Sequence, residues 1–105
     1  MVKIDASELP LIVEACLIWT GFGRTATPQR DDSSLRTRFG NESASRLQTI
    51  LKSLENEFYQ SDAWKMATDL REMGELAGRD FKSKHPEVPD EIVQALKWCY
   101  TYDYK

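Results

Sequence analysis

The most regular pattern of hydrophobic and polar positions lies at residues 41–58. Apolar residues recur there every three or four positions, which places them on one face of an α-helix. Asn41 stands at the start of this pattern, and its side chain can accept a hydrogen bond from the first free backbone amides, so we expect it to cap the helix. The apolar positions are Ala44, Leu47, Ile50, Leu51, Leu54 and Phe58.

Residues 7–20 predict a helix of a different kind, because they are apolar on almost every side. Between Leu9 and Trp19 only Glu14 is strongly polar. A helix without a polar face belongs in the middle of a fold, so we expect the other helices to surround this one. Ser7 is the expected N-cap. A buried strand is the alternative, since so short an apolar run fits both structures.

The segment 62–83 predicts a third helix, which we expect Ser61 to cap. Its small residues Ala67, Gly74 and Gly78 form an edge that we expect the backbone of the first helix to approach closely. The apolar arc of this helix is wide, and the other predicted helices do not cover all of it. A homodimer that buries the rest of the arc is therefore an alternative to a monomer. The apolar positions are Ala63, Trp64, Met66, Leu70, Met73, Leu76, Ala77 and Phe81.

The last predicted helix begins at about Pro89. Pro89 suits a first helical position, and Asp90 and Glu91 behind it favour the helix dipole. The inward positions are Ile92, Val93, Leu96, Cys99 and Tyr100. Together the patterns predict an all-α protein, a compact single-domain bundle of about four helices over residues 1–105. One long loop, residues 23–40, would connect the first two helices.

That loop holds Arg24, Arg30, Arg36 and Arg38, which are four of the seven arginines of the chain. Its local charge is +2 in a chain of net charge −3, so the remainder carries −5. An acidic remainder argues against broad binding to nucleic acid or to a membrane surface. Three interpretations stay open. The arginines are tied to carboxylates of the body, or they recognise an acidic protein partner, or they hold a phosphate or nucleic acid.

Two hydrophobic residues of the loop, Leu35 and Phe39, are expected to anchor it on the core. Connections longer than about 12 to 15 residues are usually functional or disordered, whereas anchors of this kind favour the interpretation that the loop is tied to the body. If the segment between the anchors is extended, Arg36 and Arg38 project to the same side.

Aromatic residues alternate at the C-terminus, at Trp98, Tyr100, Tyr102 and Tyr104. In an extended tail they would share one face, whereas on a continuing helix they would point in several directions. Tyrosine and tryptophan are enriched at protein interfaces. We therefore expect Trp98, Tyr102 and Tyr104 to bind a partner. The alternative is that they only cover the end of the core.

Groups suited to catalysis are few. His85 is the only histidine, and its place beside Pro86 between two helices predicts a solvated side chain. Cys16 and Cys99 lie in apolar stretches at no metal or redox spacing, so we expect buried, reduced thiols and neither metal nor cofactor. No apolar stretch reaches the ~20 residues of a membrane span, so we expect a cytoplasmic protein without membrane contact.

These features favour a non-enzymatic protein-interaction module, for example an immunity or antitoxin-like inhibitor, that binds a protein partner through the Arg-rich loop and the aromatic C-terminus. The first alternative is binding of nucleic acid, which the acidic charge disfavours, or of a phosphorylated small ligand through the same loop. The second alternative is an enzyme whose site is assembled between helices. The predicted partner-binding residues are Arg24, Arg30, Arg36, Arg38, Trp98, Tyr102 and Tyr104.

Overall fold

The computed structural model describes residues 5–104, so residues 1–4 and 105 of the predicted domain lie outside the description. The described part begins with one 3₁₀ turn, η1 (Ala6–Glu8). The helices that follow are α1 (Leu9–Thr20), α2 (Asp32–Phe39), α3 (Asn41–Phe58), α4 (Ala63–Met66), α5 (Leu70–Lys84) and α6 (Asp90–Asp103). The predicted all-α fold is confirmed, with no strand in residues 5–104. Instead of four helices there are five of eight residues or more, together with the single turn α4.

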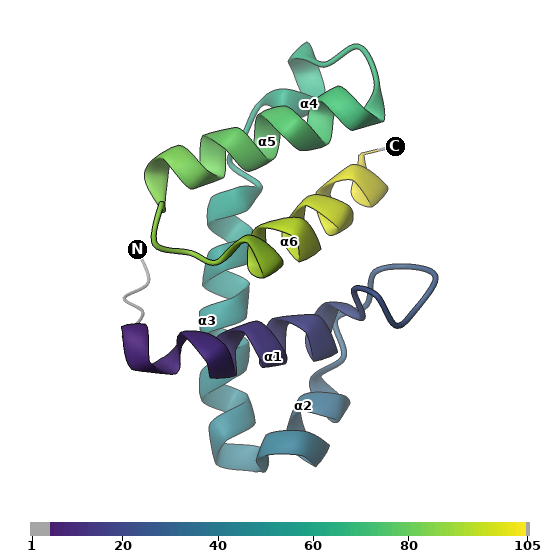
Figure 1. The fold of residues 1–105 in the computed structure, drawn as a ribbon. Coiled ribbons are helices and arrows are strands. Elements are labelled where there is room, and N and C mark those ends of the chain that lie inside the picture. The colour runs from purple at the N-terminus through teal and green to yellow at the C-terminus, as the bar shows by residue number, and fades with distance from the viewer. Residues whose placement is uncertain (1–4, 105) are drawn as a thin grey trace.

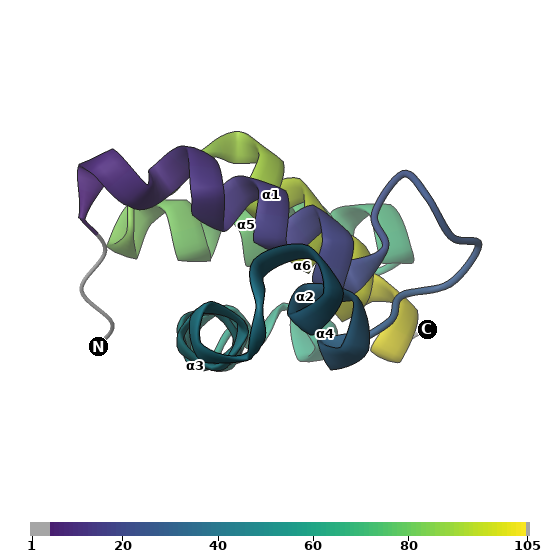
Figure 2. The ribbon, with the colours of Figure 1, turned by 90° about the horizontal axis from the view of Figure 1, so that it is seen from below.

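The helices form two layers. In the first layer α1, α6 and α5 lie side by side with α6 in the middle, and α3 crosses behind them (Figure 1). Seen from below, α3 points nearly end-on under that layer, with α2 beside it (Figure 2). The prediction that the first helix is central is therefore wrong. That place belongs to α6, whose Ile92, Ala95, Leu96 and Cys99 are at most 1% exposed.

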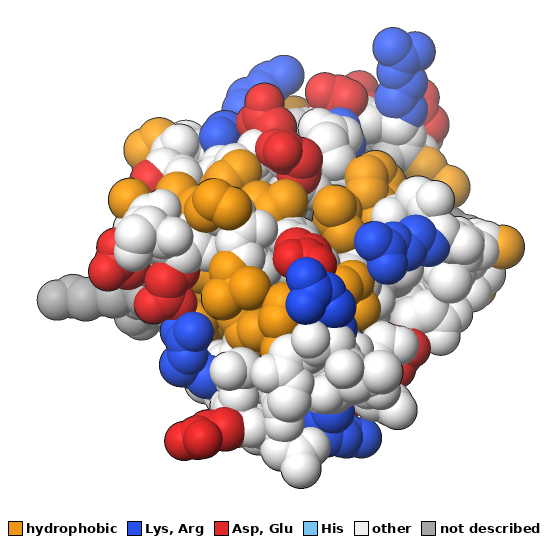
Figure 3. Space-filling view, turned by 60° about the horizontal axis from the view of Figure 1, so that its bottom comes forward, with side chains coloured by type: hydrophobic (Ala, Val, Ile, Leu, Met, Phe, Trp, Pro, Cys, Tyr) orange, Lys and Arg blue, Asp and Glu red, His pale blue; other side chains and the backbone are white. Residues whose placement is uncertain are grey.

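The helix α1 buries one face and leaves the other partly at the surface. Its inner face, from Ile12 to Trp19, contacts α6 and α3, but a two-layer fold has no further layer to cover the outer face. Figure 3 shows hydrophobic side chains in a broken band across the face of the molecule that α1 crosses. The half-exposed apolar residues of α1 that pack against the core are Leu11, Val13, Leu17 and Ile18.

The long helix α3 has the bounds and the inner face that its sequence predicts. Five of its six predicted apolar positions are at most 3% exposed, and Ile50 is half-buried at the edge of the core. The predicted cap is wrong, because Asn41 is the first helical residue and Gly40 precedes it with a φ of 85°. Glycine tolerates this left-handed backbone, which turns the chain sharply from α2 into α3.

The N-terminal cap also differs from the prediction. Asp5 accepts hydrogen bonds from both the backbone N–H and the hydroxyl of Ser7, so Ser7 is a donor to the cap and not the cap itself. The helix α1 then starts at Leu9 with Pro10 in its first turn, where a missing N–H leaves no hydrogen bond unmade.

The predicted loop of residues 23–40 contains a helix, α2, in its second half. The Asp31 carboxylate starts this helix by accepting hydrogen bonds from the N–H of Ser34 at 3.0 Å and from its hydroxyl at 2.6 Å. Leu35 is fully buried and Phe39 packs half-buried against the core, so both predicted anchors are confirmed. The irregular connection is therefore limited to residues 21–31.

The predicted third helix is broken into α4 and α5. Asp69 starts α5 by accepting a hydrogen bond from the N–H of Glu72 at 2.8 Å. The Glu72 carboxylate in turn accepts one from the N–H of Thr68 at 3.0 Å. These two hydrogen bonds resemble a capping box and favour a new helix start over a continuing helix. As a result Met66 and Leu70, predicted as core residues, are 66% and 44% exposed.

The small-residue edge of α5 faces α6 and not the first helix, which corrects the prediction. A Cβ atom added at Gly74 would lie 3.0 Å from the Cγ of Lys97 and 3.0 Å from the Cγ2 of Thr101. At Gly78 the nearest atom would be 3.7 Å away, on Val93. The close approach of the two helices therefore depends on glycine at position 74.

Candidate functional site

The helix α4, the start of α5 and the end of α6 lie at one end of the molecule (Figure 1), and they carry the most exposed large hydrophobic side chains of residues 5–104. We refer to these side chains together as the aromatic end. Trp64 and Tyr104 stack there, with ring centroids 5.6 Å apart and ring planes inclined by only 5°. The aromatic end consists of Trp64, Met66, Leu70, Tyr102 and Tyr104.

Tyr100 holds the aromatic end from beneath. Its buried hydroxyl donates a hydrogen bond to the carbonyl oxygen of Ser61 at 2.8 Å and accepts one from the N–H of Trp64 at 3.2 Å. Its ring lies 4.7 Å from that of Tyr104, centroid to centroid. Ser61, the predicted cap of the third helix, contributes a hydroxyl that accepts a hydrogen bond from the N–H of Ala63. The single turn α4 is thus fixed to α6.

Arg30, in the connection after α1, is tied into the body of the protein. Its guanidinium forms ion pairs with Glu55 of α3 and, at 3.7 Å, with Asp103 of α6. It lies over the ring of Trp19, 5.5 Å from the ring centroid, and donates to the Tyr59 hydroxyl. Burial and the hydrogen bond to Asp103 raise the pKa of Tyr59 well above its usual value, so this phenol stays protonated. Arg30 therefore links the loop, α3 and the end of α6.

The other three arginines of the predicted site lie apart from Arg30. Arg38 pairs with Glu14 of α1 at 2.8 Å, whereas Arg24 and Arg36 are exposed and form no ion pair with any residue from 5 to 104. Because α2 is helical, Arg36 and Arg38 point roughly 200° apart around its axis, and the extended segment that would place them on one side does not form. Arg24 and Arg38 line one hollow of about 400 Å³ between the loop and α2.

The three predicted aromatic residues separate into two groups. Tyr102 and Tyr104 belong to the aromatic end, but Trp98 is half-buried and packs against Phe22 with ring centroids 5.5 Å apart. The C-terminal segment is helical as far as Asp103, so an extended tail with all aromatics on one face is not what forms. The structure therefore brings Arg30, Tyr102 and Tyr104 to one end of the molecule and leaves the other predicted residues elsewhere.

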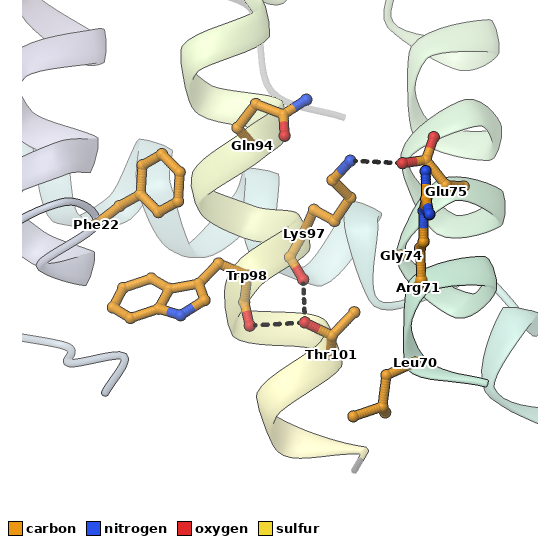
Figure 4. Close-up of a pocket in the computed structure, with 9 residues that line it drawn as sticks. All are labelled: Phe22, Leu70, Arg71, Gly74, Glu75, Gln94, Lys97, Trp98 and Thr101. Carbon is orange, nitrogen blue, oxygen red and sulfur yellow. Dashed lines mark hydrogen bonds and ion pairs between the residues drawn. The ribbon is translucent and has the colours of Figure 1, made fainter. Parts of the chain in front are cut away.

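A furrow that the sequence analysis did not anticipate runs along the seam between α5 and α6. It consists of two hollows of about 340 and 220 Å³ that share three lining residues and therefore adjoin each other. Figure 4 shows the first hollow, with Phe22 and Trp98 on one side of α6 and Leu70 on the side of α5. The shared residues are Glu75, Gln94 and Lys97.

The furrow carries more positive than negative charge. Each of its two lysines is paired with a carboxylate. Lys97 pairs with Glu75 at 3.3 Å, and Lys82 pairs with Asp90 at 3.4 Å. Its two arginines, Arg71 and Arg79, are exposed and form no ion pair in the described part of the chain, residues 5–104. An excess of two positive charges thus lies on a protein whose net charge is −3.

A sequence signal for this surface existed in the spacing along α5. Arg71 lies three positions before Gly74 and Arg79 lies four positions after Glu75, so each arginine neighbours another residue that lines the furrow. Arginines on the polar side of a helix usually only contact water, so the pattern alone does not distinguish a binding surface from an ordinary one.

His85 is buried and not solvated, which corrects the prediction. The side chain is 5% exposed, and its ring packs on Phe81 with centroids 5.0 Å apart, because the chain turns back on itself at the end of α5. Its Nε2 lies 3.5 Å from a carboxylate oxygen of Glu57 and its Nδ1 lies 3.8 Å from one of Glu87.

Both cysteines are buried, unpaired thiols, as predicted. Burial raises the pKa of Cys16 to about 12 and that of Cys99 to about 11, so neither forms the reactive thiolate at neutral pH. Within residues 5–104 no three His, Cys, Asp or Glu side chains are grouped so that they could hold a metal ion. No helix in this range has the length and apolar character needed to cross a membrane.

No protein family, curated protein or solved structure matches this chain.

Proposed function

We propose that the protein is a non-enzymatic interaction module that binds a protein partner through the aromatic end. The observation that carries this proposal is that the five most exposed large hydrophobic side chains of residues 5–104 belong to three segments at one end of the molecule (Figure 1), where Trp64 and Tyr104 stack on each other. Single exposed hydrophobic residues are ordinary on a protein surface, whereas several gathered at one end of a small protein are typical of a binding site.

The aromatic end is also rigid, which favours tight binding. Tyrosine and tryptophan have few rotatable bonds, so burying them against a partner costs little conformational entropy. The two hydrogen bonds of the Tyr100 hydroxyl fix the backbone that carries Trp64, and the stack with Tyr104 fixes its ring. The partner that fits this surface offers an aliphatic or aromatic side chain that can lie flat on the stacked rings.

The Arg-rich loop contributes less to this proposal than its composition suggests. Arg30 and Arg38 already have internal partners, which leaves Arg24 and Arg36 for a partner protein. The same pairing weakens the alternative of a nucleic-acid or phosphate ligand, because two free guanidinium groups on separate elements neutralise few phosphates.

Three narrower statements go with the proposal. Two buried, unpaired cysteines support a cytosolic location, where thiols stay reduced. An immunity or antitoxin-like inhibitor is the form of the proposal in which the partner is a harmful enzyme that loses activity when bound. A homodimer through the aromatic end is the form in which the partner is a second copy, and sedimentation over a range of concentrations tests it.

The proposal is tested by affinity capture from the organism that makes the protein, with nuclease present. The wild type is compared with Trp64→Ser/Tyr104→Ser, which removes the stacked pair, and with Arg24→Ala/Arg36→Ala, which removes the two unpaired arginines of the loop. A protein captured by the wild type is then purified, and its affinity for all three baits is measured by calorimetry.

We expect the partner to be lost from the aromatic variant, with its affinity reduced about a hundredfold, because central aromatic residues of an interface contribute 2 kcal/mol or more. A partner that binds both variants as tightly as the wild type would contradict the proposal. Binding that disappears on nuclease treatment, or that depends on the loop arginines and falls steeply with salt, would support the nucleic-acid alternative.

A further inference from the structure

We propose that the furrow between α5 and α6 binds an acidic helical segment of the partner protein. This inference rests on the proposed function, because Leu70 belongs both to the furrow and to the aromatic end. It adds the chemistry and the shape of the segment that the partner supplies.

The charges of the furrow favour an acidic occupant. Both lysines are already paired with carboxylates, but Arg71 and Arg79 have no ion pair with any residue from 5 to 104. They are eight residues apart on α5, which is about 12 Å along the helix axis. A single small anion can reach only one of them, whereas a peptide with two carboxylates at a matching distance can reach both. Guanidinium groups grip carboxylates in a bidentate manner, so this match also fixes the register of the peptide.

The walls of the furrow favour a helix over an extended strand. Beyond the first turn of α5, both walls are helices whose backbone amides and carbonyls are bonded within the helix, so they offer few free groups for main-chain pairing along the furrow. An extended peptide would leave its own backbone groups unpaired on burial, whereas a helix brings its backbone hydrogen bonds with it. From Leu70 to Lys82 the wall measures about 18 Å, which is about three turns of a docked helix.

One end of the furrow supplies an apolar anchor point. Phe22 and Trp98 stand on one side of the first hollow and Leu70 on the other (Figure 4). An aliphatic or aromatic side chain of the docked helix can lie between them, next to the aromatic end. The acidic residues of that helix then extend along the two arginines.

The test is a selection from a displayed library of random peptides of about 16 residues, long enough for four helical turns. Peptides are enriched on the wild type after depletion on Arg71→Glu/Arg79→Glu. The matched control is Lys52→Glu/Lys84→Glu, which changes the net charge by the same amount at exposed positions outside the furrow. Circular dichroism on heating checks that all variants fold equally well.

We expect the enriched peptides to share an apolar residue and two carboxylates seven or eight positions apart. A synthetic representative is expected to bind the wild type and the control about equally, to bind the arginine variant at least about tenfold more weakly, and to gain helical dichroism when bound.

Enriched peptides that lack the carboxylate pair, or that bind the arginine variant as tightly as the wild type, would overturn the inference, and so would the absence of any enriched peptide. Peptides that depend on Trp64 and Tyr104 but not on the arginines would overturn the inference and leave the proposed function standing. The capture experiment, which uses only the aromatic and loop variants, tests that function separately.

Discussion

Two side chains, Arg30 and Tyr100, join segments that are distant in the sequence. Each is half-buried or buried and makes several polar contacts. Each therefore supplies a hydrogen-bond or ion-pair partner to groups on several elements. A planar guanidinium suits the Arg30 position, because it pairs with two carboxylates and lies flat on an indole ring. Substitutions at these two residues should therefore affect stability more than their surface neighbours do.

Arg30→Ala is expected to lower the free energy of unfolding by about 1 to 2 kcal/mol, since hydrogen bonds to charged groups contribute in this range and water screens this one only partly. Arg24→Ala is the control, because it removes an exposed arginine of the same loop and should change stability by less than about 0.5 kcal/mol. Urea denaturation measures both. Equal effects would mean that Arg30 does not hold the loop.

Tyr100→Phe is expected to cost about 1 to 3 kcal/mol, because it leaves the Ser61 carbonyl and the Trp64 N–H without their buried partner. Faster amide hydrogen exchange at Trp64 should accompany the loss. The comparison is Tyr104→Phe, which keeps the ring that stacks on Trp64 and should leave stability nearly unchanged. An unchanged exchange rate in Tyr100→Phe would show that α4 is held by other contacts.

Among the contacts between helices, the close packing of α5 against α6 gives the most specific prediction for stability. Two glycines lie at this contact, and both weaken the helix by about 1 kcal/mol relative to alanine. Only one of them is required by the neighbouring helix, because an added Cβ has room at Gly78 and none at Gly74.

Alanine at these two positions should therefore act in opposite directions. Gly78→Ala is expected to raise the free energy of unfolding by up to about 1 kcal/mol through helix propensity. Gly74→Ala is expected to lower it by up to about 2 kcal/mol, because the stiff β-branched Thr101 cannot move away as easily as a lysine chain. Thermal melts of the two variants measure the difference, and a melting temperature raised by both would contradict it.

The helices were predictable in proportion to their length and regularity. α3 repeats its apolar spacing over five turns, and both its bounds and its inner face follow from that spacing. The helix α2 has only two apolar residues, Leu35 and Phe39, which are too few to establish a helical period in eight residues. The break before α5 was hidden because the apolar spacing continues through it, although the capping pair Asp69 and Glu72 marks it in the sequence.

The candidate surfaces were less predictable than the helices, because exposure and pairing are decided by neighbours distant in sequence. Nothing local distinguishes Arg30, which is tied to α3 and α6, from Arg24, which is not. Arg71 and Arg79 likewise have the pattern of ordinary solvated residues until the position of α6 is known. The aromatic tail was recognised from its composition, but its helical path separates Trp98 from Tyr104.

The whole molecule is flat, with Cα extents of 42, 28 and 17 Å. Two layers of helices enclose one core, and each layer keeps an outer face at the surface. The outer face of the first layer therefore carries both the furrow and the partly exposed side of α1, with the aromatic end at its margin. A flat shape offers a large area to a partner from a chain of only 105 residues.

One core implies that the two thiols become accessible together. Cys16 on α1 and Cys99 on α6 are both fully buried. At pH 8 both are expected to react with a thiol reagent at least about a thousandfold more slowly than in the unfolded chain, since a stability of ~5 kcal/mol leaves fewer than one chain in a thousand open. Mass spectrometry of the labelled chain follows each thiol, and rapid labelling of only one would show that its helix opens by itself.

The three tryptophans of the chain occupy three different environments. Trp19 is buried beneath Arg30, Trp98 is half-buried against Phe22, and Trp64 is 45% exposed at the aromatic end. The fluorescence of Trp19 reports on the core, whereas the emission of Trp64 depends on the water around its ring. The difference between the fluorescence of the wild type and of Trp64→Phe therefore isolates the signal of one surface, without any dye attached to it.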